Sequence, residues 1–295
     1  MYMNDLKKIF PSLCYKDEGV NIPEKYSWFI TDDHKIIGID KKELTHKDEE
    51  ILSAFLTPYH IFIPQPTELE QIWNQRIHTN TNNEYVNTFR FVYFSTKNTP
   101  MEPKLFKEAI HNFYTNPVAI MWENDHQGVI IEEKPNISDE SISYEQMIDV
   151  LMSDLYINIR FCIGPYMNKL ERLNDFYTTF IKEANIAFHY TDQSVVTYVD
   201  AIPYLLIHQA EKEFLQKTKD MILGELTNDQ DLLHSIKVFI LSNQNVTTAA
   251  KKLHLHRNSL QYRLDKFIDK TGIDVRQFSG AMAVYLAILS MVHKK

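Results

Sequence analysis

Two short helical patterns separated by a three-residue turn lie between Asn245 and Gly272, and they constrain the fold of this chain strongly. The first pattern, NVTTAAKKL, has Asn245 in position to cap its start. It also holds Ala249 and Ala250, small residues across which a second helix can pass closely. After the turn HLH, the pattern RNSLQYRLDKFIDKT runs to Gly272, a typical C-terminal cap. This arrangement predicts a helix-turn-helix.

A further helix is predicted before this motif, because DLLHSIKVFILSN carries one apolar stripe at helical spacing. The members of that stripe are Leu232, Leu233, Ile236, Phe239 and Ile240. In the helix after the turn, Leu260, Leu264 and Phe267 lie within a narrow arc at about 100° per residue. We expect these three residues to face the core, so that the polar residues at the start of the same helix point outward.

The outward residues are of the types that contact DNA. Arg suits guanine, and Asn and Gln suit adenine. In a helix-turn-helix the N-terminal residues of the second helix enter the major groove. The predicted DNA-binding residues of that helix and its cap are His256, Arg257, Asn258, Ser259, Gln261, Tyr262, Arg263 and Lys266. Those of the first helix, which suit phosphate, are Thr247, Thr248, Lys251 and Lys252.

Two of these assignments have a structural alternative. Arg263 lies toward the inner rim of its helix, where an ion pair with Asp265, Asp269 or Asp274 is the other interpretation. Tyr262 can simply shield the helix.

The charge distribution separates this C-terminal part from the rest of the chain. Residues 231–295 hold ten Lys and Arg against four Asp and Glu, a net +6, and the remainder holds 21 against 35, a net −14. A basic module on an acidic body predicts a polyanion partner for the module alone. Because the body repels DNA, we expect binding to be confined to one face and to weaken steeply with salt.

The chain is predicted to be an α+β multidomain protein. Residues 86–200 contain strands and helices in the order β-α-β-β-α-β, which matches a ferredoxin-like sheet, followed by a helix and a last strand, SVVTYV. The expected domains are an N-terminal α+β domain at 1–80, this α/β domain at 86–200, a helical connector at 201–228 and an all-α helix-turn-helix domain at 229–295. In the first domain we expect a hairpin turning at residues 32–34 and a helix capped by Thr45 and Asp48.

Several classes of protein are excluded by composition. Only 7 residues are Gly, which argues against a glycine-rich nucleotide cradle. No apolar run reaches the length of about 18 residues that indicates a membrane span, and no secretory signal is recognisable. Cys14 and Cys162 match no metal spacing, and no catalytic motif is present. We therefore expect a cytoplasmic protein without metal, cofactor or catalytic residues.

The segment NVTTAAKKLHLHRNSLQYRLDKFIDKTGIDV resembles the C-terminal helix-turn-helix of the PucR/CdaR family of bacterial regulators. The stretch HRNSLQYRL is also similar to the Fis-type helix-turn-helix, in which the positions of Arg257, Ser259 and Gln261 contact DNA. The resemblance implies a transcription regulator that binds double-stranded DNA sequence-specifically, often as a dimer. Two copies place their recognition helices about 34 Å apart, so a palindromic operator is expected. A small-molecule effector of unknown identity is a further expectation.

The same family commonly carries a degenerate GGDEF-like domain, which residues 86–199 resemble in element order. A cyclase needs a GGDEF or GGEEF signature on the central hairpin and an acid at the end of the first strand. This chain has ENDHQG and YFST at those places, so we expect no enzyme activity. The alternatives are an enzyme or nucleotide-binding protein of cyclase ancestry, and a protein-interaction module that does not bind DNA.

Overall fold

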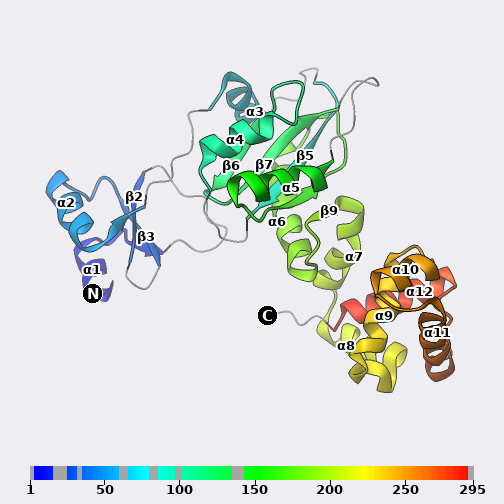
Figure 1. Cartoon of the computed structure of the whole chain (residues 1–295). Coiled ribbons are helices and arrows are strands. Elements are labelled where there is room, and N and C mark those ends of the chain that lie inside the picture. The colour runs from blue at the N-terminus through cyan, green and yellow to red at the C-terminus, as the bar shows by residue number, and fades with distance from the viewer. Residues whose placement is uncertain are drawn as a thin grey trace. The chain divides into compact units, whose positions relative to one another are not determined.

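A computed structural model describes residues 3–15, 25–31, 35–59, 66–79, 86–96, 101–134 and 143–291 (Figure 1). The chain forms two compact units, Met1–Ile181 and Lys182–Lys295. The first unit is mixed α/β and the second is almost wholly helical, in agreement with the α+β multidomain class. Within the described ranges, no helix combines the length and apolar character needed to cross a membrane.

The N-terminal part of the first unit is a small antiparallel sheet in the order β1-β3-β2-β4, with helices α1 and α2. The bounds are α1 Met3–Ile9, β1 Cys14–Tyr15, β2 Tyr26–Ile30, β3 Ile36–Asp40, α2 His46–Phe55 and β4 Thr57–Pro58. The predicted hairpin is confirmed by the pairing of β2 with β3, although its turn at 32–34 lies outside the described residues. The predicted capping box of Thr45 and Asp48 is also confirmed.

A second, larger sheet forms the centre of the first unit. Its elements are β5 Phe89–Ser95, α4 Pro103–His111, β6 Ala119–Asn124, β7 Gln127–Glu133, α5 Tyr144–Leu155 and β8 Arg160–Ile163. This is the predicted β-α-β-β-α-β order. The strands lie in the order β6-β7-β5-β8, and each neighbouring pair is antiparallel.

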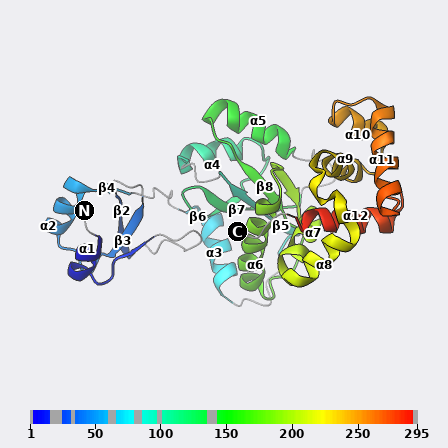
Figure 2. The ribbon, with the colours of Figure 1, turned by 90° about the horizontal axis from the view of Figure 1, so that it is seen from below.

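The two faces of this sheet are covered by different helices because side chains of β5 alternate. Phe94 packs on Phe106 of α4, with ring centroids 4.7 Å apart. Phe91 faces the other way and meets Tyr177 of α6 (Leu173–Tyr190) edge to face at 5.4 Å. Figure 2 shows α4 and α5 on one side of the sheet and α3 and α6 on the other.

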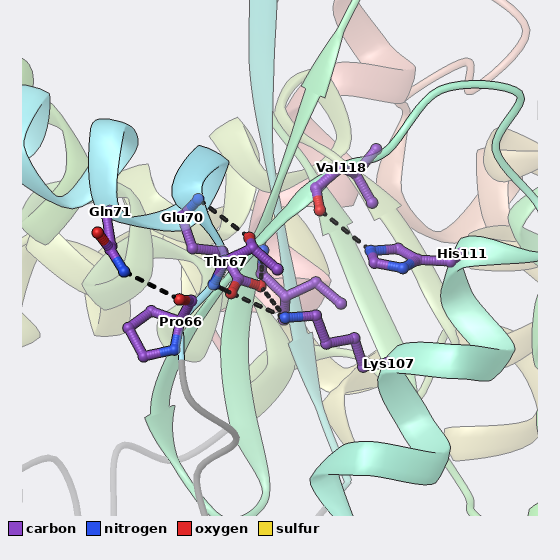
Figure 3. Close-up of polar contacts among 8 residues, drawn as sticks. Pro66, Thr67, Glu70, Gln71, Lys107, His111 and Val118 are labelled. Atoms are coloured by element: carbon purple, nitrogen blue, oxygen red, sulfur yellow. Dashed lines mark hydrogen bonds and ion pairs between the residues drawn. The ribbon is translucent and has the colours of Figure 1, made fainter.

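Helix α3 (Glu68–His78) is fixed to the central sheet, although the sequence assigned it to the domain at 1–80. The buried carboxylate of Glu70 accepts hydrogen bonds from the backbone N–H of Thr67 at 2.7 Å, from Lys107 Nζ at 2.8 Å and from the backbone N–H of Ile120 at 3.2 Å (Figure 3). The ring of Trp73 lies 4.7 Å from that of Phe89 on β5. The boundary between the two compact units, at residues 181 and 182, lies within α6.

The second unit begins with the end of α6 and contains seven further helical elements among its described residues. Their bounds are α7 Tyr198–Gln209, α8 Lys212–Leu223, the 3-10 helix η1 Gly224–Asn228, α9 Gln230–Leu241, α10 Val246–Lys252, α11 Arg257–Thr271 and α12 Phe278–Leu289. The predicted strand SVVTYV is shorter than expected: β9 is Val195–Thr197, because Thr197 and Asp200 form a capping box that starts α7. The predicted connector is two helices, since α7 ends at Gln209.

The core of the helix-turn-helix region follows the predicted apolar stripes. Of the α9 stripe, four members are buried and Ile240 is partly buried against the same cluster. These buried side chains, together with Leu260, Leu264, Phe267 and residues of α12, form one apolar cluster. Packing of the apolar side of α11 in this cluster therefore fixes the orientation of its polar side.

Candidate nucleic-acid interface

Helix α10 begins as the sequence predicted, with Asn245 as its cap. The Asn245 Oδ1 atom accepts a hydrogen bond from the backbone N–H of Thr248 at 3.0 Å. Ala249 and Ala250 are 0% and 3% exposed, and α10 packs against both α9 and α11. The two alanines therefore occupy the position at which a larger side chain would push the helices apart.

The turn between α10 and α11 is held by backbone hydrogen bonds. The N–H of Leu255 donates to the carbonyl oxygen of Ala250 at 2.9 Å, and His254 takes a left-handed conformation with φ of 53°. His256 then caps α11, because its Nδ1 accepts from the backbone N–H of Asn258 at 3.3 Å. The three residues after the cap, Arg257, Asn258 and Ser259, are exposed.

The buried side of α11 is the predicted one: Leu260, Leu264 and Phe267 are each 0% exposed. Gly272 ends the helix with φ of 70°, as expected of a C-terminal cap. Ten of the predicted DNA-binding residues are exposed on α10, on α11 or at its cap. They are Thr247, Thr248, Lys251, Lys252, His256, Arg257, Asn258, Ser259, Gln261 and Tyr262.

The remaining two predicted contacts are partly buried and engaged within the domain. Arg263 Nη1 donates to Ser235 Oγ at 2.5 Å, and Lys266 Nζ lies 3.1 Å from Asp229 Oδ2. The alternative partners considered for Arg263 on its own helix and the following loop are not the ones it contacts. Of these, Asp265 pairs instead with Arg276.

The stretch from within α9 to the middle of α11 carries positive charges and no acidic residue. Residues 232–264 contain five Lys and Arg and no Asp or Glu. Lys251, Lys252 and Arg257 from this stretch are exposed close to the helix-turn-helix turn. A run of cations uninterrupted by acids creates a positive potential that attracts polyanions and is screened by salt.

Metal binding finds no support in the part of the chain that the structure describes. No group of three or more His, Cys, Asp or Glu side chains there is arranged to hold an ion. The His254 and His256 pair thus lacks further ligands among the described residues.

Comparison with known proteins identifies the C-terminal part. Residues 232–290 match the model of the PucR C-terminal helix-turn-helix domain. The chain is 26% identical over 146 residues to the proline-responsive transcriptional activator PutR of Bacillus subtilis, a match that covers 45% of this chain and 34% of PutR.

Two other proteins are similar over longer stretches. The crystal structure of a regulator of polyketide synthase expression from Bifidobacterium adolescentis matches 75% of this chain and 91% of its own, with 13% identity and a TM-score of 0.34. The uncharacterized protein YxkF of Bacillus subtilis is 31% identical over 300 residues, which cover 97% of this chain and 98% of YxkF. The chain therefore belongs to the family of YxkF, and it carries a PucR C-terminal helix-turn-helix domain.

Proposed function

We propose that this DNA-binding transcription regulator reads a palindromic operator as a homodimer, with the start of α11 in the major groove. The observation that carries the proposal is the exposure of Arg257, Ser259 and Gln261 on a helix whose opposite side is fully buried through Leu260 and Leu264. A rigidly seated helix with a free polar first turn presents its side chains to base edges in one orientation.

The exposed residues divide into two roles by chemistry. Arg257 is suited to a bidentate contact with guanine, and Asn258 and Gln261 to adenine, each worth about 1–3 kcal/mol of discrimination. Lys251 and Lys252 at the end of α10 are suited to phosphates, which position the protein without specifying sequence.

The homodimer is proposed because one recognition helix covers only half of a typical operator. A two-fold arrangement repeats the same contacts about 34 Å away along the duplex, so the operator is a palindrome with half-sites about one turn apart. A cytoplasmic location is part of this proposal, because a regulator of this kind has to reach the genome.

We further propose that the central domain is a degenerate GGDEF-like domain that is not an enzyme. The strand order β6-β7-β5-β8 with antiparallel neighbours supports a ferredoxin-like topology. In the β6–β7 hairpin, Asp125 lies beside His126, with Oδ1 2.7 Å from Nδ1, and no paired acids or glycines precede it as a cyclase signature requires. Such a domain is suited to receiving a signal, including a small-molecule effector.

The test of the DNA-reading face uses the full-length chain and an operator selected by it from a random duplex pool. Arg257→Ala and Gln261→Ala should each weaken binding to the selected duplex by about tenfold or more, measured by fluorescence anisotropy, since each removes one base contact. Lys270→Ala is the matched control, because Lys270 is exposed on the same helix about 20 Å from Arg257 along its axis. Selective binding retained by both alanine variants would refute the proposed face.

The dimer is tested on the same duplex. Inserting about five base pairs between the half-sites rotates one half-site to the opposite side of the helix and should abolish the gain from the second site. Equal affinity for the spaced duplex would contradict the two-fold arrangement.

A further inference from the structure

Arg263 is joined to α9 by a short chain of hydrogen bonds. Its Nη1 donates to Ser235 Oγ at 2.5 Å and lies 3.5 Å from the carbonyl oxygen of Asp231. Ser235 is 0% exposed, and its Oγ in turn donates to the Asp231 carbonyl at 2.8 Å. Since the hydroxyl hydrogen is thus directed to Asp231, the lone pairs of Oγ are left to accept from the guanidinium.

A second contact lies one turn further along α11. Lys266 Nζ is 3.1 Å from Asp229 Oδ2, and Asp229 is the residue that caps α9. Both contacts leave the same side of α11, because Arg263 and Lys266 are three residues apart. Both also end at the first turns of α9. The middle of α11 is thus held to α9 at two polar points in addition to its buried apolar side.

We infer that Arg263 and Lys266 are positioning residues of the DNA-binding domain rather than DNA contacts. They fix the angle between α11 and α9. This angle determines which base pairs Arg257 and Gln261 reach. Arg257 lies six residues before Arg263, about 9 Å along the helix, so a small rotation at the clamp displaces the reading end. This inference rests on the proposed function.

A cation on a recognition helix can have one of three roles. A phosphate contact contributes about 0.9 to the slope of log affinity against log salt. A base contact contributes preference at one position of the operator. A positioning residue contributes to specific binding without either signature, and its loss is duplicated by loss of the partner that holds it.

The experiment compares Arg263→Ala, Ser235→Ala and the double variant in the full-length chain. The probes are the duplex selected by the wild-type chain and a random duplex of equal length, titrated at several salt concentrations. We expect about a tenfold loss of affinity for the selected duplex in each single variant, no further loss in the double variant, and an unchanged salt slope. Affinity for the random duplex should stay within about twofold, because the phosphate contacts remain.

Ser235→Ala keeps the experiment decisive if Arg263→Ala does not fold, because it removes one buried hydroxyl from α9 and leaves the arginine in place. Lys252→Ala is the matched control for a phosphate contact and should lower the salt slope by about 0.9. A lower slope in Arg263→Ala, or full selectivity in Ser235→Ala, overturns the positioning role. A lower melting temperature with unchanged preference for the selected duplex makes the clamp merely structural and also overturns it.

These outcomes are distinguishable from failure of the proposed function. If the wild-type chain selects no duplex, or if Arg257→Ala and Gln261→Ala both bind normally, the DNA-reading face itself is refuted. If those variants lose binding while Arg263→Ala and Ser235→Ala do not, only the positioning role is refuted.

Discussion

The carboxylate of Asp229 joins two helices, since its Oδ2 accepts from Lys266 Nζ at 3.1 Å and its Oδ1 from the backbone N–H of Leu232 at 3.2 Å. The hydrogen bond from Lys266 is the main reason that the pKa of Asp229 lies below its ordinary value of 3.8, and the Leu232 N–H lowers it further. A carboxyl group whose pKa is lower in the folded state stabilises the fold above its unfolded pKa. That stability is lost as the pH falls through the folded pKa.

We predict that Asp229→Asn removes this pH dependence. The wild type should be more stable than the variant near neutral pH, by about 1 kcal/mol or less because both charged groups are partly exposed. The difference should vanish as the pH is lowered past 3.8, the ordinary value, into the range below it. Thermal unfolding of both proteins followed by far-UV circular dichroism measures the effect. A difference that stays constant into acid would contradict the assignment.

His254 provides a prediction about the turn of the helix-turn-helix. Its φ of 53° lies in the left-handed region, which disfavours β-branched residues and suits glycine. His254→Ile should therefore destabilise the domain by about 1–2 kcal/mol, whereas His254→Gly should change its stability by less than about 1 kcal/mol. Urea unfolding of the two variants side by side tests this. Equal destabilisation by both substitutions would mean that the backbone conformation is not the cause.

The place where α10 crosses α9 and α11 provides a prediction about packing. Ala249 is 0% exposed where α10 packs on α9 and α11, so Ala249→Leu should destabilise the domain by about 1–3 kcal/mol through overpacking. Lys252→Leu on the exposed side of the same helix is the control and should stay within about 0.5 kcal/mol. Similar unfolding midpoints for the two variants would show that the crossing tolerates a large side chain.

Local patterns in the sequence predicted the motif well because its determinants are local. The caps Asn245 and Gly272, and the buried set Leu260, Leu264 and Phe267, depend on residues within one helix and its ends, and all of them are confirmed. The element order of the central domain was also predictable, since each strand and helix has its own periodicity.

Contacts between distant segments could not be predicted in the same way. The partner of Arg263 is Ser235, which lies 28 residues earlier on another helix, whereas the sequence offered acidic partners close to the arginine. Helix α3 falls within the expected domain at 1–80, whose predicted end lies at HTNTNNEY, residues 78–85, because that stretch is polar and has no apolar period. Only the folded chain brings Glu70 to Lys107, 37 residues away. The ten exposed residues proposed to contact DNA stay predictions, which the binding measurements on Arg257→Ala and Gln261→Ala test.

Glu70 gives the last prediction, which concerns the central domain. Glu70 is only 4% exposed, and its carboxylate forms an ion pair with Lys107, whose side chain is 15% exposed. Glu70→Ala leaves that ammonium nearly buried without its partner, so it should destabilise the first unit by about 3–5 kcal/mol. The double variant Glu70→Ala with Lys107→Met removes the stranded charge and should recover part of the loss. All three tryptophans, Trp28, Trp73 and Trp122, lie in this unit, so their fluorescence reports its unfolding in urea. No recovery in the double variant would show that the hydrogen bond from the backbone N–H of Ile120 on β6 to Glu70, rather than the ion pair, holds α3 on the sheet.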